Sequence, residues 1–293
     1  MAGGLKILIN KYNRHLVKIL NIGVFNVLLI FGIGVQAVFA GEPESVILEN
    51  IYRTNYNIAF SKISLMAEDD SSKCVLKGIA YVSRFDDLGD TLDLDSALFT
   101  LKNCKTGGFW EPLRLYEISF VNSILGNTLK SILEARNAAL IFEKLGDLDS
   151  KAFYAIYTHY NPIAKSKQED LKNGFENSSR FSPILGNAYM WILYDKKKYA
   201  EALEIANALL KRYPKHPIIL QNRADMLFKL GRVQEATSIY KESEALYAKR
   251  APGSIRYWCA VVNLAKITGA DLWKEKLNSF EYKRIMHWMP EGI

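Results

Sequence analysis

Histidines, cysteines and scattered carboxylates are the side chains of this 293-residue chain that could carry chemistry. No stretch matches the glycine-rich phosphate loop, the H-E-x-x-H zinc motif or the G-x-S-x-G nucleophile turn. The histidines stand too far apart in the sequence to form a local set of metal ligands. They are His15, His159, His216 and His287. The sequence therefore predicts a protein that is not an enzyme and that uses neither a metal nor a cofactor.

One pair of residues, Ser238 and Lys241, has the spacing of a serine–lysine nucleophile. Enzymes that use this pair also carry S-D-N and K-T-G motifs, and both are missing here. The segment also has helical hydrophobic spacing, in which Tyr240 is expected to pack in the core. We interpret the serine–lysine spacing as a coincidence.

Acidic side chains gather between residues 85 and 95, in the stretch FDDLGDTLDLD. A calcium-binding loop of the EF-hand type needs a glycine at its sixth place and a distant bidentate glutamate, and this stretch has neither. We therefore favour a structural interpretation over a calcium site. The stretch is predicted to be an acidic loop that leads into a helix from about Ser96, with Asp93 or Asp95 as the N-cap.

The three cysteines, Cys74, Cys104 and Cys259, all follow the first forty residues. An oxidising compartment would allow a disulfide between Cys74 and Cys104, which would join two neighbouring helices. The odd number leaves at least one free thiol. We nevertheless favour buried structural cysteines for all three, because apolar or helical sequence flanks each of them.

The first forty residues have the pattern of a secretory signal. Four basic residues precede an apolar run from Ile19 to Val35, and Val38 and Ala40 put small residues at the −3 and −1 positions of a cut after Ala40. We predict that residues 1–40 are a signal peptide and that the rest works outside the cytoplasm, most simply in the periplasm. The alternative is an uncleaved membrane anchor over residues 19–40, because the apolar run approaches the roughly 18 residues that suggest a membrane span.

Charge argues against a nucleic-acid partner. The chain has a net charge of +7, but the leader holds four basic residues and no acidic ones, which leaves 34 basic against 31 acidic residues after position 40. The remaining charge is unevenly distributed, at −6 over residues 41–100 and +6 over residues 165–250. The basic segment could steer an acidic protein partner, although solvated helix faces explain it more simply.

Two neighbouring segments, which start at Ser182 and at His216, align without gaps. Ala202 and Ala236 stand 34 residues apart, where a second helix must approach the first closely and a larger side chain would force the two apart. A glycine past the first helix of one copy and a proline past the second helix of the other mark helix ends. The repeat-packing positions are Tyr199, Ala202, Pro214, Gly231, Ala236 and Tyr240.

Thirty-four residues is the period of the tetratricopeptide repeat, and the two copies resemble that family. They are degenerate, since Gly186 and Leu220 stand where the family has tryptophan. The wider chain is similar to exported bacterial tetratricopeptide proteins. The resemblance implies an all-α fold, a right-handed α-α solenoid of about six to seven helical hairpins.

This interpretation divides the chain into four parts. Residues 1–40 are the leader, 41–181 are degenerate hairpins, 182–250 are the two clearest repeats and 251–293 are C-terminal capping helices. Outside the two repeats, the expected helices are Trp110–Leu125, Thr128–Leu145, Ser150–Tyr160, Glu169–Ser178, Ile255–Thr268 and Leu272–Met289.

The family resemblance also implies a function. In tetratricopeptide proteins the first helix of each pair lines a concave surface, and positions two, five, nine and twelve tend to contact the partner. The matching residues are Ile184, Asn187, Trp191, Tyr194, Ile218, Gln221, Asp225 and Phe228. We therefore expect a non-catalytic scaffold that binds a protein or peptide, acidic in one version of the hypothesis, on its concave face. The alternative is a membrane-tethered structural subunit of a larger envelope assembly.

Overall fold

The computed structural model describes residues 43–160, 167–252 and 254–269. Within these ranges the chain forms helices and no β-strand, so the predicted all-α class is confirmed. The predicted leader and the predicted helix Leu272–Met289 lie outside the described residues.

The helices follow one another with short connections. They are α2 (Pro43–Tyr52), α3 (Tyr56–Ser64), α4 (Lys73–Leu88), α5 (Leu92–Lys102), α6 (Trp110–Ile124), α7 (Thr128–Leu145), α8 (Leu148–Tyr160), α9 (Gln168–Asn177), α10 (Ser182–Asp195), α11 (Tyr199–Arg212), α12 (Pro217–Lys229), α13 (Val233–Arg250) and α14 (Ile255–Thr268).

Tight turns separate the helices of a pair where the sequence predicts them. Gly126, between α6 and α7, has a φ of 75°, and Gly231, between α12 and α13, has a φ of 77°. Only glycine adopts this left-handed conformation at no steric cost, so each glycine allows the chain to reverse directly after a helix.

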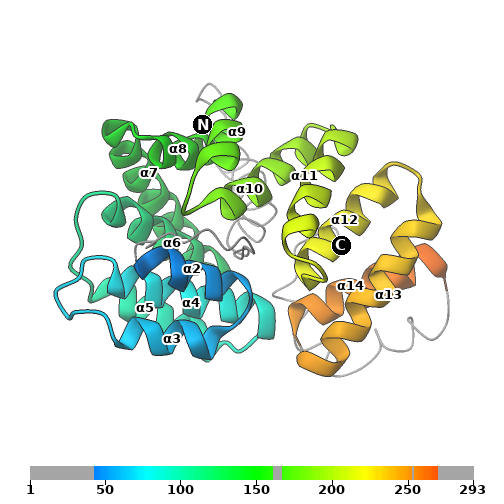
Figure 1. Cartoon of the computed structure of the whole chain (residues 1–293), viewed down its shortest axis with the longest axis horizontal. Coiled ribbons are helices and arrows are strands. Elements are labelled where there is room, and N and C mark those ends of the chain that lie inside the picture. The colour runs from blue at the N-terminus through cyan, green and yellow to red at the C-terminus, as the bar shows by residue number, and fades with distance from the viewer. Residues whose placement is uncertain (1–42, 161–166, 253, 270–293) are drawn as a thin grey trace, which may run out of the picture.

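Neighbouring helices pack on each other along the whole described chain, from α2 on α3 to α13 on α14. Figure 1 shows that this path also curls back on itself, because α14 returns to the side of α4. Helices at the two ends of the described chain are therefore in contact.

Alanines hold the closely packed positions. Ala202 in α11 and Ala236 in α13 are fully buried, and Ala59 holds the same place in α3. Each lies three residues after the first residue of its helix, as the repeat register predicts. The side chain of Tyr240 is also buried, and its hydroxyl donates to Asp225 on the preceding helix.

Hydrogen bonds join the first helices of successive pairs. Asn222 Nδ2 in α12 donates to Asn187 Oδ1 in α10 at 3.0 Å. Gln221 Nε2, also in α12, donates to the carbonyl oxygen of Arg256 in α14 at 2.7 Å. Both bonds span 35 residues and are buried, so they fix the register between one pair and the next.

The prediction of an acidic loop over residues 85–95 is wrong. Helix α4 continues to Leu88 and α5 begins at Leu92, so only a short turn around Gly89 is not helical. Asp93 does not cap the helix from outside; it lies in the first turn of α5 and accepts two hydrogen bonds from Arg84. Asp86, Asp87 and Asp93 each pair with an arginine, and the partners of the first two, Arg256 and Arg250, lie far away in the sequence.

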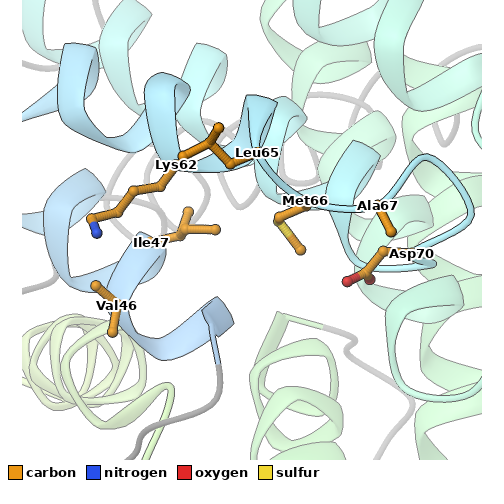
Figure 2. Close-up of a pocket in the computed structure, with 7 residues that line it drawn as sticks. All are labelled: Val46, Ile47, Lys62, Leu65, Met66, Ala67 and Asp70. Atoms are coloured by element: carbon orange, nitrogen blue, oxygen red, sulfur yellow. The ribbon is translucent and has the colours of Figure 1, made fainter.

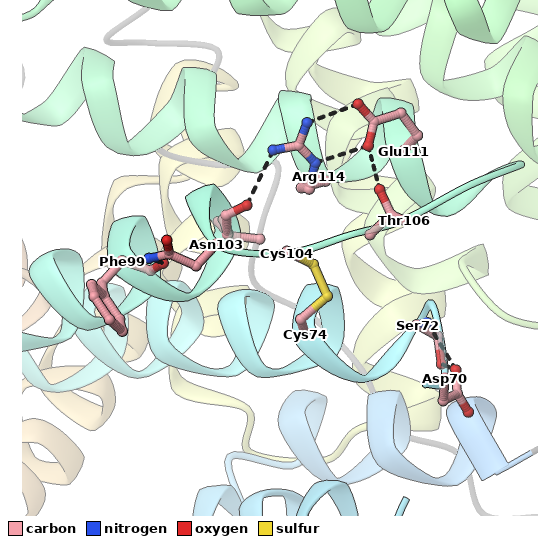
Figure 3. Close-up of a disulfide and its surroundings, with 10 residues drawn as sticks. Asp70, Ser72, Cys74, Phe99, Asn103, Cys104, Thr106, Glu111 and Arg114 are labelled. Atoms are coloured by element: carbon pink, nitrogen blue, oxygen red, sulfur yellow. Dashed lines mark hydrogen bonds and ion pairs between the residues drawn. A yellow bond between two sulfur atoms is a disulfide. The ribbon is translucent and has the colours of Figure 1, made fainter. Parts of the chain in front are cut away.

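The favoured interpretation of Cys74 and Cys104 as unbridged structural cysteines is wrong, because a disulfide joins Cys74, in the first turn of α4, to Cys104 in the connection after α5 (Figure 3). The two Cα atoms lie 5.9 Å apart. The connection is held further by Thr106, which donates to Glu111, and by the ion pair of Glu111 with Arg114. Cys259 remains a free thiol, and burial raises its pKa to about 12.

Candidate functional site

The side chains predicted to contact a partner lie mostly inside the molecule. The buried ones are Ile184, Asn187, Trp191, Ile218 and Gln221. Tyr194 and Asp225 are partly buried, and Phe228 is exposed. Asn187 and Gln221 take part in the hydrogen bonds between successive pairs. The role of these eight residues in partner binding stays a prediction, because most of their side chains are not accessible in this structure.

Two predicted contact residues carry buried hydrogen-bond donors without an acceptor. The two atoms are Nδ2 of Asn187 and Nε1 of Trp191, and neither makes a hydrogen bond in the part of the chain that the structure describes. The residues are four positions apart in α10, so their side chains share one face of that helix. A buried donor without a hydrogen-bond partner lowers the stability of the fold. A bound segment with free carbonyl or carboxylate oxygens would remove this penalty.

An accessible groove lies elsewhere, between α2, α3 and the connection to α4 (Figure 2). Its volume is about 360 Å³. Ile47 is buried and forms the base, whereas Leu65 is 84% exposed and Val46 is 40% exposed at the rim. The lining is Val46, Ile47, Lys62, Leu65, Met66, Ala67 and Asp70. A hollow with such walls suits an aliphatic side chain.

The two ends of this α2–α3 groove carry opposite charges. Lys62 lies at one end and Asp70 at the other, as Figure 2 shows. No ion pair of Lys62 is present among the described residues. The groove therefore offers a free ammonium group beside its apolar walls.

The wall formed by the α3–α4 connection is held in place by several bonds. Lys73 Nζ donates to the carbonyl oxygen of Met66 at 2.8 Å and pairs with Glu68 at 2.6 Å. Asp70 Oδ1 accepts from both the backbone N–H and the hydroxyl of Ser72. The disulfide at Cys74 then fixes the start of α4, as Figure 3 shows beside the Asp70–Ser72 contact. The groove is thus bordered by an ordered wall.

A second notable cluster is polar and joins the ends of the described chain. Asp86 of α4 pairs with Arg256 of α14, 170 residues away, and Asp87 pairs with Arg250 of α13, 163 residues away. Both carboxylates are fully buried. We call these four residues the seam.

Burial has the largest effect on the pKa values of the two seam carboxylates, Asp86 and Asp87. It raises the pKa of Asp86 to about 6, and Arg256 beside it acts in the opposite direction. Burial also raises the pKa of Asp87, whereas Arg250 and the hydroxyls of Tyr56 and Tyr247 lower it. Asp86 Oδ1 has no hydrogen-bond partner in the described residues. The seam is therefore an incompletely satisfied ion-pair cluster.

A second contact between the two ends lies at His216. Its Nε2 is 3.1 Å from the carbonyl oxygen of Tyr52 at the end of α2, and the rings of Tyr52 and Tyr213 are 4.0 Å apart. Burial lowers the pKa of His216 to about 4, although the hydrogen bond to Tyr52 acts in the opposite direction. His216 is thus a buried residue at a contact between the two ends of the described chain.

Glu117 in α6 is a buried residue that sequence reasoning missed. It is fully buried, and neither carboxylate oxygen has a partner among the described residues. Burial raises its pKa well above the usual value. The sequence gives no signal for it, because a glutamate at this position of an amphipathic helix looks like an ordinary surface residue.

In residues 43–160, 167–252 and 254–269, no three histidine, cysteine or acidic side chains come together in a way that could hold a metal ion. In the same residues, no helix has the length and apolar character needed to cross a membrane.

The comparisons with known proteins find no match: neither a protein-family model, nor a curated protein, nor a solved structure matches the chain.

Proposed function

We propose that this chain is a non-catalytic scaffold of the tetratricopeptide type, a solenoid of helical hairpins that binds a protein or peptide outside the cytoplasm. The accessible α2–α3 groove, with its aliphatic walls and free lysine, is the observation that carries the proposal. The leader pattern supports export, and the 34-residue period supports the repeat type.

The groove specifies the chemistry of the segment that would bind. Its volume of about 360 Å³ has room for a large aliphatic side chain, and Ile47, Leu65 and Met66 would surround that side chain. Lys62 would pair with a carboxylate on one side of it, and Asp70 would favour a basic residue on the other. We therefore propose a peptide segment with an aliphatic residue between an acidic and a basic one.

Selection of peptides on the immobilised full chain tests this function. We would use a phage library of random nine-residue peptides and compare the wild type with Leu65→Glu and with a matched control, Leu230→Glu. Leu230 is also an exposed leucine but lies outside the groove, in the turn before α13. Selected peptides should share the predicted pattern, and Leu65→Glu should lower their affinity for the chain by about tenfold or more.

Charge reversal sharpens this selection experiment. Lys62→Glu should shift the selected pattern away from acidic residues, because the free ammonium group at that end of the groove is replaced by a carboxylate. Peptides without the pattern, or peptides that bind Leu65→Glu and Leu230→Glu equally well, would refute the groove as the binding site.

A row of exposed leucines on α7 favours a second candidate function, the membrane-tethered structural subunit. Leu129, Leu133 and Leu140 are 71%, 49% and 47% exposed. Their spacing puts them on one face of α7, where they could contact a neighbouring subunit. Washing native membranes with salt and then with detergent tests this reading. A chain that salt releases is not tethered, whereas a tethered subunit requires detergent.

A further inference from the structure

The seam differs in chemistry from the packing between neighbouring helices. Neighbours pack through a continuous apolar core that runs from α2 to α14. By contrast, the seam between α4 and the last two helices contains two buried ion pairs, Asp86–Arg256 and Asp87–Arg250. Among helix pairs well separated along the described chain, α4 and α14 are the only two with substantial contact. The two ends are therefore joined at a few points, where buried ion pairs stand beside the ring contact of Tyr52 with Tyr213 and the packing of Cys259 on the apolar cluster that includes Val82 and Phe85.

Buried ion pairs hold surfaces together weakly. The cost of removing two charges from water offsets much of their attraction, and well-packed apolar residues of similar size often stabilise a contact as well or better. In the seam the attraction offsets even less of the desolvation cost, because Asp86 Oδ1 is buried and has no hydrogen-bond partner among the described residues. Separation of the ends would return both carboxylates to water.

We propose that the seam is a reversible closure, at which the N-terminal helices α2–α4 and the C-terminal helices α13–α14 separate and rejoin in the folded protein. The raised pKa of Asp86 agrees with this picture, since it shows that the closed state strains the charged form of this carboxylate. This inference goes beyond the proposed function, because the α2–α3 groove is lined by other residues.

Distances between spin labels on the full chain test the closure. One label at Ser61→Cys on α3 and one at Lys249→Cys on α13 span the seam, and Cys259→Ser removes the free thiol. A second label pair, at Ser61→Cys on α3 and Asp95→Cys on α5, lies on one side of the seam and serves as the control. The wild type should show a short and a long distance across the seam, and the control pair a single distance.

Two seam variants should shift this distribution in opposite directions. Asp86→Asn leaves Arg256 buried without its charge partner and should enlarge the long-distance fraction. The double variant Asp86→Leu with Arg256→Met replaces the ion pair with apolar side chains and should remove that fraction. A single distance that is the same in the wild type and both variants would overturn the proposal. Should Asp86→Asn fail to fold, as circular dichroism would show, equal distributions in the wild type and the apolar variant would overturn it.

Discussion

His216 makes a testable link between burial and pH. In the folded protein burial lowers its pKa to about 4, from an ordinary value of 6.5. Between these two values the unfolded chain binds a proton that the folded chain does not, so stability should fall as the pH drops from 6.5 to 4. The loss should reach about 3 kcal/mol, at roughly 1.4 kcal/mol for each pKa unit.

His216→Gln provides the comparison, because its side-chain amide can still donate to the carbonyl oxygen of Tyr52. Denaturant unfolding of both proteins at pH 7, 5.5 and 4 measures the difference. The variant should lose less stability than the wild type over this range. Parallel pH profiles would show that His216 is not buried in neutral form.

Glu117 should have the opposite pH dependence. Its pKa is raised by burial, so the folded chain holds a proton that the unfolded chain releases as the pH rises above the usual value near 4.5. The stability that this protonated carboxyl contributes should therefore be complete at low pH and decline as the pH rises. Glu117→Gln, which cannot ionise, should gain stability relative to the wild type between pH 4.5 and pH 8. A difference that does not change with pH would contradict the burial of an unpaired carboxyl.

At the scale of helices, α11 allows a matched test of the repeat register. Ala202 is fully buried in this helix, whereas Ala208 in the same helix is exposed. Ala202→Leu should lower the free energy of unfolding by about 1–3 kcal/mol, because the larger side chain overpacks the contact between paired helices. Ala208→Leu should have little effect. Equal stability of the two variants in denaturant would show that the register is wrong.

The disulfide between α4 and the connection after α5 should contribute strongly to stability. Its cysteines are 30 residues apart in the sequence, and closing a loop of this size restricts the unfolded chain by roughly 3–4 kcal/mol in the chain-entropy model. The double variant Cys74→Ser with Cys104→Ser should lose stability of this order. Cys259→Ser, which removes a thiol that is not cross-linked, should lose much less. Comparable losses in both proteins would argue against the disulfide.

The sequence predicts the helix pairs well because their signals are local. Gly126 and Gly231 mark turns, and the 34-residue spacing of Ala202 and Ala236 marks the close contacts between paired helices. It does not predict the seam. Asp86 looks like part of an acidic loop until Arg256, 170 residues away, is seen beside it.

The sequence also does not predict the α2–α3 groove or the burial of the partner-contact residues. Met66 and the other aliphatic residues of the groove belong to the same class as core residues, so no motif separates them. Trp191 fits a partner-contact position in the repeat pattern, yet its side chain is buried in the structure. Curvature accumulates from small rotations between successive helix pairs, and residue types alone do not encode it.

Over the whole molecule, contact between distant helices changes how the fold should come apart. A linear row of helix pairs has two free ends, and each end can fray without disturbing the middle. Here α4 is tied to α14 and α2 to the start of α12, so fraying at either end must first break a contact made by the other end. While the seam is closed, the terminal pairs should therefore exchange their amide hydrogens as slowly as the central pairs, and a variant that favours the open state should speed this exchange. Such long-range contacts also raise the contact order, so the last step of folding should be slower than in an open array of the same length.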